Sequence, residues 1–151
     1  MKKINFKLAL AILASVVMFL SFGCNKDDEN NPVGGGDSDL VGSWTLTGAT
    51  INPGTDSAQV FTQLALQLAG VSMVLAVNGD GSYTMTTTDS DGTSVETGTW
   101  SVSNGNITIT AQGEQPFTTS YSISGNQLTL NVNEIEFGGD AFPAILIFTK
   151  Q

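Results

Sequence analysis

The side chains that could do chemistry in this sequence are almost all carboxylates. The 151 residues include 14 aspartates and glutamates, five lysines, one cysteine, no arginine and no histidine. Glu134 and Glu136 alternate along an apolar segment, so both would lie on one face of a strand, where two carboxylates can act as general acid and base. Two solvated carboxylates beside a glycine-rich segment produce the same pattern, and this is the interpretation we favour.

Three aspartates, Asp80, Asp89 and Asp91, fall in glycine-containing turns, a setting that faintly resembles calcium loops. These turns lack the full set of oxygen ligands that calcium needs, so ordinary turn chemistry is the favoured interpretation. The absence of histidine and the single cysteine exclude a Cys/His zinc site and an intrachain disulfide. We therefore expect no metal, no cofactor and no enzymatic activity.

The one cysteine, Cys24, stands at the end of an apolar run. Residues 1–23 begin with the basic stretch MKKINFK, continue through the apolar residues 8–22 and end on Gly23. This order is typical of a secretory signal peptide, and the apolar part is shorter than the ~20 residues of a spanning helix. LSFGC resembles the lipobox of bacterial lipoproteins, in which the cysteine becomes the first mature residue and is acylated. We predict a lipoprotein signal peptide over 1–23 and lipidation of Cys24; a stray cysteine within the signal is the alternative.

The residues that follow the cysteine, NKDDEN, combine a lysine with an acidic cluster. They resemble the signal that sends lipoproteins of Bacteroidetes to the outer face of the outer membrane. A solvated tether would have a similar composition. We expect residues 24–39 to be a flexible acidic and glycine-rich tether. The expected location is the outer membrane, with the protein lipid-anchored and facing the cell exterior.

Removal of residues 1–23 would make the protein strongly acidic. Only Lys26 and Lys150 would remain against all 14 acidic residues, which gives a formal net charge of −12. Such a surface repels phosphate backbones and anionic lipid, so we expect no nucleic-acid partner.

Short alternating segments dominate the sequence from residue 40 onward. Apolar and polar residues alternate with period two, and Gly/Asn pairs between the segments supply the positive-φ residues of tight hairpin turns. Two of the segments, 71–77 and 143–150, are apolar on both faces. The eight expected strands are 41–50, 71–77, 79–89, 93–103, 106–112, 117–124, 126–132 and 143–150.

One segment, residues 56–70, has helical rather than strand periodicity. Val60, Phe61, Leu64 and Leu68 recur at helical spacing, with Asp56 as the expected N-cap and Gly70 as the expected stop. We expect one short amphipathic helix between the first two strands, where it could cover the second face of a two-sided apolar strand.

Consecutive hairpins with short links favour an all-β protein. Closing the sheet removes exposed strand edges, so the pattern predicts an eight-stranded up-and-down antiparallel barrel. The interior of such a barrel is either filled by side chains or holds one small ligand. An immunoglobulin-like sandwich would use the same strands but needs longer crossovers.

The stretch DLVGSWTL makes the fold prediction more specific. Gly42, Ser43 and Trp44 resemble the Gly-x-Trp signature of the first lipocalin strand, and GDGSYTMT, TGTWSVSNGNITIT and YSISGNQLTL look like the short lipocalin-like domains of Bacteroidetes lipoproteins. The resemblance covers residues 40–151 and implies a lipocalin-like barrel domain there. It also implies that Trp44 packs across the closed end of the barrel, often under a basic residue of the last strand. Lys150 is the one candidate for that role, and a solvated C-terminal lysine is the alternative.

The inward-facing side chains could line a ligand pocket or form a packed core, and the sequence leaves both open. The first hypothesis is therefore a lipid-anchored lipocalin-like protein with a small apolar ligand. The alternative is a surface module with a filled core that binds a protein or glycan through its loops, with Phe137 and Phe142 of the expected loop 133–144 as contacts. If a cavity exists, the expected ligand-binding residues are Leu46, Tyr83, Met85, Trp100, Val102, Ile107, Ile109, Tyr121, Ile123, Leu128 and Leu130.

Overall fold

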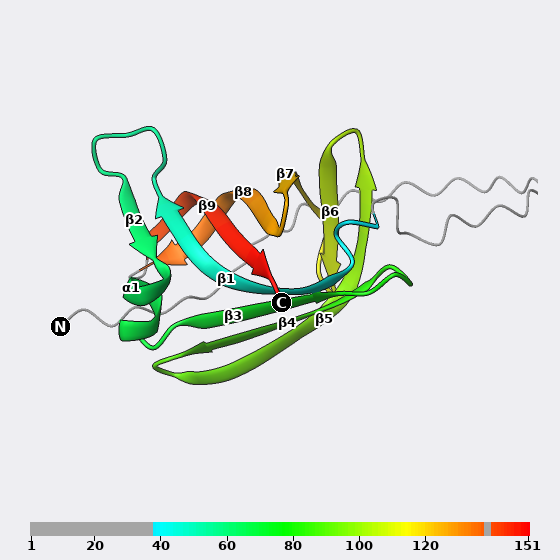
Figure 1. Cartoon of the computed structure of the whole chain (residues 1–151), viewed down its shortest axis with the longest axis horizontal. Coiled ribbons are helices and arrows are strands. Elements are labelled where there is room, and N and C mark those ends of the chain that lie inside the picture. Colours follow the sequence, from blue (N-terminus) through cyan, green and yellow to red (C-terminus); the bar gives the residue numbers. More distant parts are fainter. Residues whose placement is uncertain (1–37, 138–139) are drawn as a thin grey trace, which may run out of the picture.

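A computed structural model describes residues 38–137 and 140–151, and most of these residues are in strands (Figure 1). The predicted signal peptide, Cys24 and all of the predicted tether except residues 38 and 39 lie outside the described residues. In chain order the elements are β1 (Gly42–Ile51), β2 (Gln59–Thr62), α1 (Gln63–Leu68), β3 (Ser72–Val77), β4 (Ser82–Asp89), β5 (Gly92–Ser103), β6 (Asn106–Ala111), β7 (Phe117–Ser124), β8 (Gln127–Phe137) and β9 (Asp140–Lys150).

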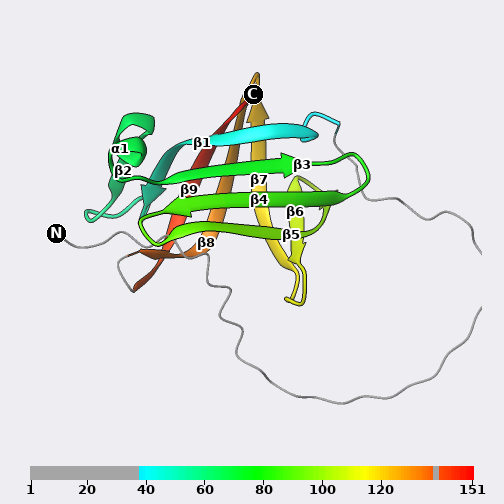
Figure 2. The ribbon, with the colours of Figure 1, turned by 90° about the horizontal axis from the view of Figure 1, so that it is seen from below.

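The strands form a closed antiparallel barrel, which confirms the predicted fold. Each of β3 to β8 pairs with the next strand in the chain, β1 pairs with β3, and β1 also pairs with β9 to close the sheet. These eight strands are the barrel, and the short β2 is an additional strand on β1. Figure 2 shows β3, β4 and β5 side by side with β6 to β9 crossing behind them.

Tight hairpin turns connect neighbouring strands, as the Gly/Asn pairs predict. Between β5 and β6, Asn104 and Gly105 have φ values of 52° and 75°. Two successive positive φ values define the type I′ turn, whose twist matches that of the flanking strands. This turn holds Ser103 opposite Asn106 and sets the register of the hairpin.

A β-bulge in β1 keeps apolar side chains inside the barrel along the whole strand. The register against β9 shifts between Leu46 and Gly48. Trp44 and Leu46 face inward before the shift, and Ala49 and Ile51 are buried after it. The inserted residue therefore changes the inward phase from even to odd numbers, which strict alternation does not predict.

The predicted helix over 56–70 is wrong in its first half. Residues 59–62 pair with Gly48–Ile51 of β1 as β2, and the helix α1 begins only at Gln63. The N-cap is Thr62, whose hydroxyl accepts a hydrogen bond from the Ala65 amide, rather than Asp56. The helix contacts β1 and β2 and ends before Gly70, whose φ of 71° fits the predicted stop.

The predicted inner face of this helix is also wrong. Leu64 and Leu68 are 63% and 82% exposed, and Val60 is 73% exposed on β2. Leu66 is the buried residue of α1.

Most of the expected loop 133–144 belongs to strands. β8 extends to Phe137 and β9 begins at Asp140, with a register shift between Val132 and Ile135. Phe142 is half-buried and packs against the core, so it is not the exposed contact that the loop interpretation required. The side chain of Phe137 lies outside the described part of the structure.

The two ends of the barrel differ. At the end that contains Trp44, the aromatic ring is fully buried, and its Nε1 donates a 2.7 Å hydrogen bond to the carbonyl of Leu40. We call this the Trp44 end. The opposite end carries the β4–β5, β6–β7 and β8–β9 connections, and there β2 and α1 belong to the connection from β1 to β3 (Figure 1).

Candidate ligand cavity

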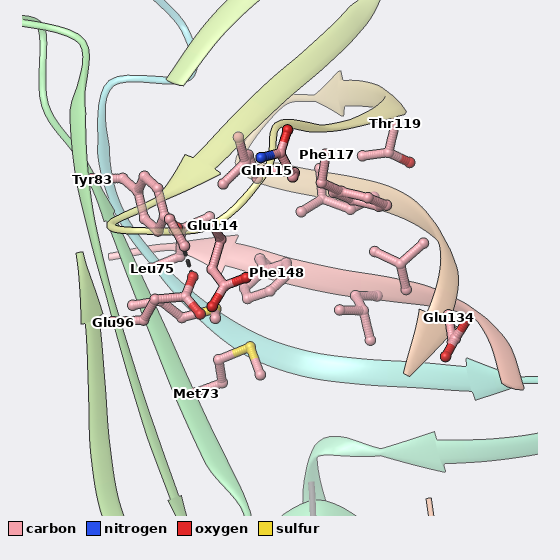
Figure 3. A pocket seen from close by; sticks show the side chains of 16 residues that line it. Met73, Leu75, Tyr83, Glu96, Glu114, Gln115, Phe117, Thr119, Glu134 and Phe148 are labelled. Carbon is pink, nitrogen blue, oxygen red and sulfur yellow. Dashed lines mark hydrogen bonds between the residues drawn. The ribbon is translucent and has the colours of Figure 1, made fainter. Parts of the chain in front are cut away.

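The barrel encloses a cavity of about 310 Å³ (Figure 3). Most of its wall is apolar, because every second residue of the surrounding strands points inward. The apolar lining comprises Met73 and Leu75 of β3, Met85 of β4, Ile109 and Ala111 of β6, Phe117 of β7, Leu130 and Val132 of β8, and Leu146 and Phe148 of β9.

One polar pair lies inside this apolar wall. The hydroxyl of Tyr83 donates a 2.6 Å hydrogen bond to Oε1 of Glu96. Both side chains are on the inner face, because Glu96 pairs with Met85 and is in phase with the buried Trp100.

Tyr83 remains a neutral donor at physiological pH. Burial, together with the hydrogen bond to Glu96 and the negative charge of Glu96, raises the pKa of Tyr83 well above its ordinary value. The hydroxyl therefore fixes the orientation of the Glu96 carboxylate without neutralising its charge.

A glycine makes room for the tyrosine ring. Tyr83 is directly opposite Gly98 in the β4–β5 pair. A Cβ at position 98 would lie 2.7 Å from Cε1 of Tyr83 and would also clash with the carbonyl oxygen of Thr110. Position 98 must therefore lack a side chain if the ring and β6 are to stay where they are.

Two further carboxylates, Glu114 and Glu134, line the cavity. Glu114 belongs to the β6–β7 connection. Figure 3 shows its side chain extending from that connection toward Glu96. Glu134 extends from β8, and both residues are exposed, unlike the half-buried Glu96. Gln115 and Thr119 complete the polar part of the lining.

The predicted ligand-binding residues all belong to the barrel interior, but only some of them line the cavity. Tyr83, Met85, Ile109 and Leu130 do so. Leu46, Trp100, Ile107 and Leu128 are buried in the core, and Val102, Tyr121 and Ile123 pack against it. A ligand-binding role for any of them stays a prediction.

Several lining residues are not marked as inward-facing by the sequence pattern. Met73, Leu75, Leu146 and Phe148 lie on strands that are apolar on both faces, where alternation does not mark an inside. The sequence does indicate that Glu96 faces inward. It lies four residues before Trp100, and residues an even number of positions apart in a strand point to the same side.

At the Trp44 end, the structure brings together the two residues that the lipocalin resemblance implies. Trp44 and Lys150 are opposite each other in the β1–β9 pair. Nζ of Lys150 lies 5.0 Å from the centroid of the Trp44 ring and donates a 3.0 Å hydrogen bond to the carbonyl of Asp39. The side chain of Lys150 therefore contacts the first strand rather than extending freely into solvent.

The other chemical hypotheses gain nothing from the geometry. Within residues 38–137 and 140–151, no group of three or more acidic side chains is arranged to hold a metal ion. The side chain of Glu136, one member of the predicted acid/base pair, lies outside the described part of the structure. The described helical segment does not have the length and hydropathy that crossing a membrane would need.

A family model described as a lipocalin-like domain matches residues 40–130, from before β1 into β8. The chain belongs to the lipocalin-like domain family. This confirms the resemblance that the Gly-x-Trp segment suggested.

Solved structures to which this chain is similar include two from Bacteroides. An uncharacterized protein from Bacteroides eggerthii is 13% identical with a TM-score of 0.49, and 74% of this chain and 98% of that one are covered. A lipocalin-like protein from Bacteroides uniformis is 18% identical with a TM-score of 0.48, covering 75% and 99%. Fatty-acid-binding protein 1 of Echinococcus granulosus is 15% identical with a TM-score of 0.38, covering 74% and 97%. No curated protein sequence matches the lipocalin-like chain.

Proposed function

We propose that this protein binds a small apolar molecule inside its barrel. The observation that carries the proposal is the cavity of about 310 Å³ with its apolar wall. Its volume is at the lower end of the ~300–1,000 Å³ range of small-molecule pockets, so it suits a compact or slender ligand. The family assignment supports the proposal as an analogy of fold.

The driving force would be the transfer of apolar ligand surface from water to the cavity. This transfer contributes ~25 cal/mol per Å² of apolar surface buried. The wall is preformed by strands, so little ordering of the protein would oppose binding. We assign the protein a binding role and no catalytic step.

A cavity-blocking variant tests the proposal. Ile109→Trp would place an indole in the cavity, whereas Val95→Trp would place the same group on the outer face of β5, where Val95 is 64% exposed. Titration with a fluorescent apolar probe and native mass spectrometry should show binding to the wild type and to Val95→Trp. Binding to Ile109→Trp should be lost. Equal binding by all three proteins, or by none, would exclude the cavity as the site.

Ile109→Trp could also lose binding because the barrel fails to form. The smaller change Ala111→Leu, which also adds volume to the lining, covers that case. Circular dichroism of each variant establishes that the strands are intact. A folded Ala111→Leu protein with unchanged probe affinity would count against the proposal.

We further propose that Cys24 is acylated and that the protein is held on the outer membrane, facing the exterior. This proposal is supported by the order of charge, apolar run and Gly23 before the cysteine, and by the acidic cluster after it. Two or more acyl chains would anchor the domain stably, because each buried methylene contributes ~0.8 kcal/mol.

Two variants separate anchoring from surface display. Cys24→Ala should leave an uncleaved or soluble product, whereas wild-type protein should partition into the membrane fraction. Replacing Asp27, Asp28 and Glu29 by alanine should keep the anchor but protect the domain from protease added to intact cells. Membrane partition and maturation of Cys24→Ala like the wild type would contradict the anchor.

A further inference from the structure

The charge around the cavity has one sign. Its described lining includes Tyr83, Glu96, Glu114 and Glu134 as titratable groups, and no lysine or arginine. The apolar cavity is thus bordered by three carboxylates, while the remaining polar side chains of the lining, Gln115 and Thr119, are uncharged.

Glu96 is the carboxylate best placed to meet a ligand. It is half-buried on the inner face of β5, and one of its oxygens, Oε1, accepts the hydrogen bond from Tyr83. The neutral hydroxyl holds the carboxylate in position and leaves its negative charge uncompensated. A charge in partly desolvated surroundings acts more strongly on a ligand than a fully hydrated one.

The basic side chain that could offset the negative charge of these carboxylates lies at the Trp44 end of the barrel. Among residues 38–137 and 140–151, Lys150 is the one basic side chain. It pairs with Trp44, and its Nζ contacts the Trp44 ring and the Asp39 carbonyl. Lys150 is not part of the cavity lining, and the whole chain contains no arginine that could bind a carboxylate head group.

We infer that the cavity takes an amphiphilic cation, a molecule with an apolar body and a protonated amine, and disfavours a fatty acid of the same size. This inference rests on the proposed function. The apolar body occupies the space between β3, β4, β7 and β9, and the ammonium group lies against Glu96, with Glu114 and Glu134 adding to the negative potential. A carboxylate in the same position would meet three like charges and no cation.

Three probes with the same chain and different head groups test this. Decylamine, decanol and decanoate are used at pH 7 below their micelle concentrations, with affinities measured by isothermal titration calorimetry. We expect decylamine to bind about tenfold or more tightly than decanol, the scale of one retained charge contact, and decanoate to bind weakest. The preference should decrease as salt is raised.

Matched charge variants identify the carboxylate. Glu96→Gln keeps an acceptor for Tyr83 but removes the charge, so decylamine affinity should fall more than decanol affinity and most of the amine preference should be lost. Asp91→Asn removes one charge from the exposed β4–β5 turn at the same end, outside the lining, and should leave the preference intact. The blocked variant Ile109→Trp should bind none of the probes.

Failure of the proposed function and failure of the amine inference give different results. If none of the three probes binds the wild type, the proposed function falls and this inference with it. If decanol or decanoate binds as tightly as decylamine, the apolar cavity stands and the amine inference is overturned. Decylamine binding that persists in Ile109→Trp, or that falls equally in Asp91→Asn and Glu96→Gln, assigns the amine to the acidic surface and also overturns it.

Discussion

Nζ of Lys150, the last residue of the last strand, lies 5.0 Å from the centroid of the Trp44 ring on the first strand. The same nitrogen donates to the carbonyl of Asp39, and Nε1 of Trp44 donates to the carbonyl of Leu40. β1, β9 and the segment that leads into β1 are therefore tied together where the sheet closes. Neither Trp44 nor Lys150 lines the cavity, so the contacts at this end hold the barrel together.

We predict that Lys150→Met lowers the free energy of unfolding by about 1 kcal/mol. Methionine keeps the apolar stem over the ring but removes the cation–π contact and the hydrogen bond to Asp39. Urea denaturation followed by tryptophan fluorescence measures the change. Lys150→Arg, which retains the charge and can stack on the ring, should be close to wild type. A stability of Lys150→Met equal to the wild type would show that the contact contributes nothing.

Gly42, the glycine of the Gly-x-Trp segment, is predicted to be required for the contact between Lys150 and the Trp44 ring. Gly42 has a φ of 143°, and a Cβ there would lie 2.7 Å from Cε of Lys150. Gly42→Ala should therefore destabilise the barrel by about 1–3 kcal/mol. Gly79→Ala, with no atom near the added methyl group, is the control.

A double variant separates the two causes at position 42. Lys150→Ala removes the steric conflict but not the backbone strain, so Gly42→Ala should cost less in that background than in the wild type. An equal cost in both backgrounds would assign the whole effect to the backbone.

The raised pKa of Tyr83 predicts how alkaline pH affects stability. Because the folded protein favours the neutral phenol, this group contributes stability fully below its unfolded pKa of ~10, and the contribution is lost as the pH rises above that value. Tyr121→Phe leaves Tyr83 as the only tyrosine, so tyrosinate absorbance reports this residue alone. The titration should be shifted to higher pH in the folded protein relative to the same variant in urea. Coincident titrations would exclude the Tyr83–Glu96 contact.

Alternation predicts the barrel well because it is a local property. Trp44, Tyr83, Ile107 and Leu128 are on the inner face as their phases predict, and the turn at Asn104 has the expected conformation. The bulges in β1 and β8 could not be predicted, because an inserted residue is defined by the strand opposite rather than by its own neighbours.

The segment before α1 is a second place where the local sequence pattern does not determine the structure. Val60 has the spacing of a helix face, but the backbone of residues 59–62 pairs with the second half of β1 instead. Tertiary pairing overrides local periodicity there. In the cavity, the in-phase position of Glu96 is visible in the sequence, whereas Glu114 is brought in by a connection whose path the sequence does not specify.

Gly98 is predicted to be needed for the packing beside the cavity, as Gly42 is for the packing at the Trp44 end. A methyl group at position 98 would conflict with the Thr110 carbonyl and with the Tyr83 ring. Gly98→Ala should lower the free energy of unfolding by about 1–3 kcal/mol, because β6 and the ring must both move. It should also weaken the hydrogen bond to Glu96, so that Tyr83 titrates at lower pH in the Tyr121→Phe background. Thr97→Ala, an exposed neighbour, should change neither quantity. Destabilisation without a shift in the Tyr83 titration would show that β6 moves while the ring and Glu96 stay in place.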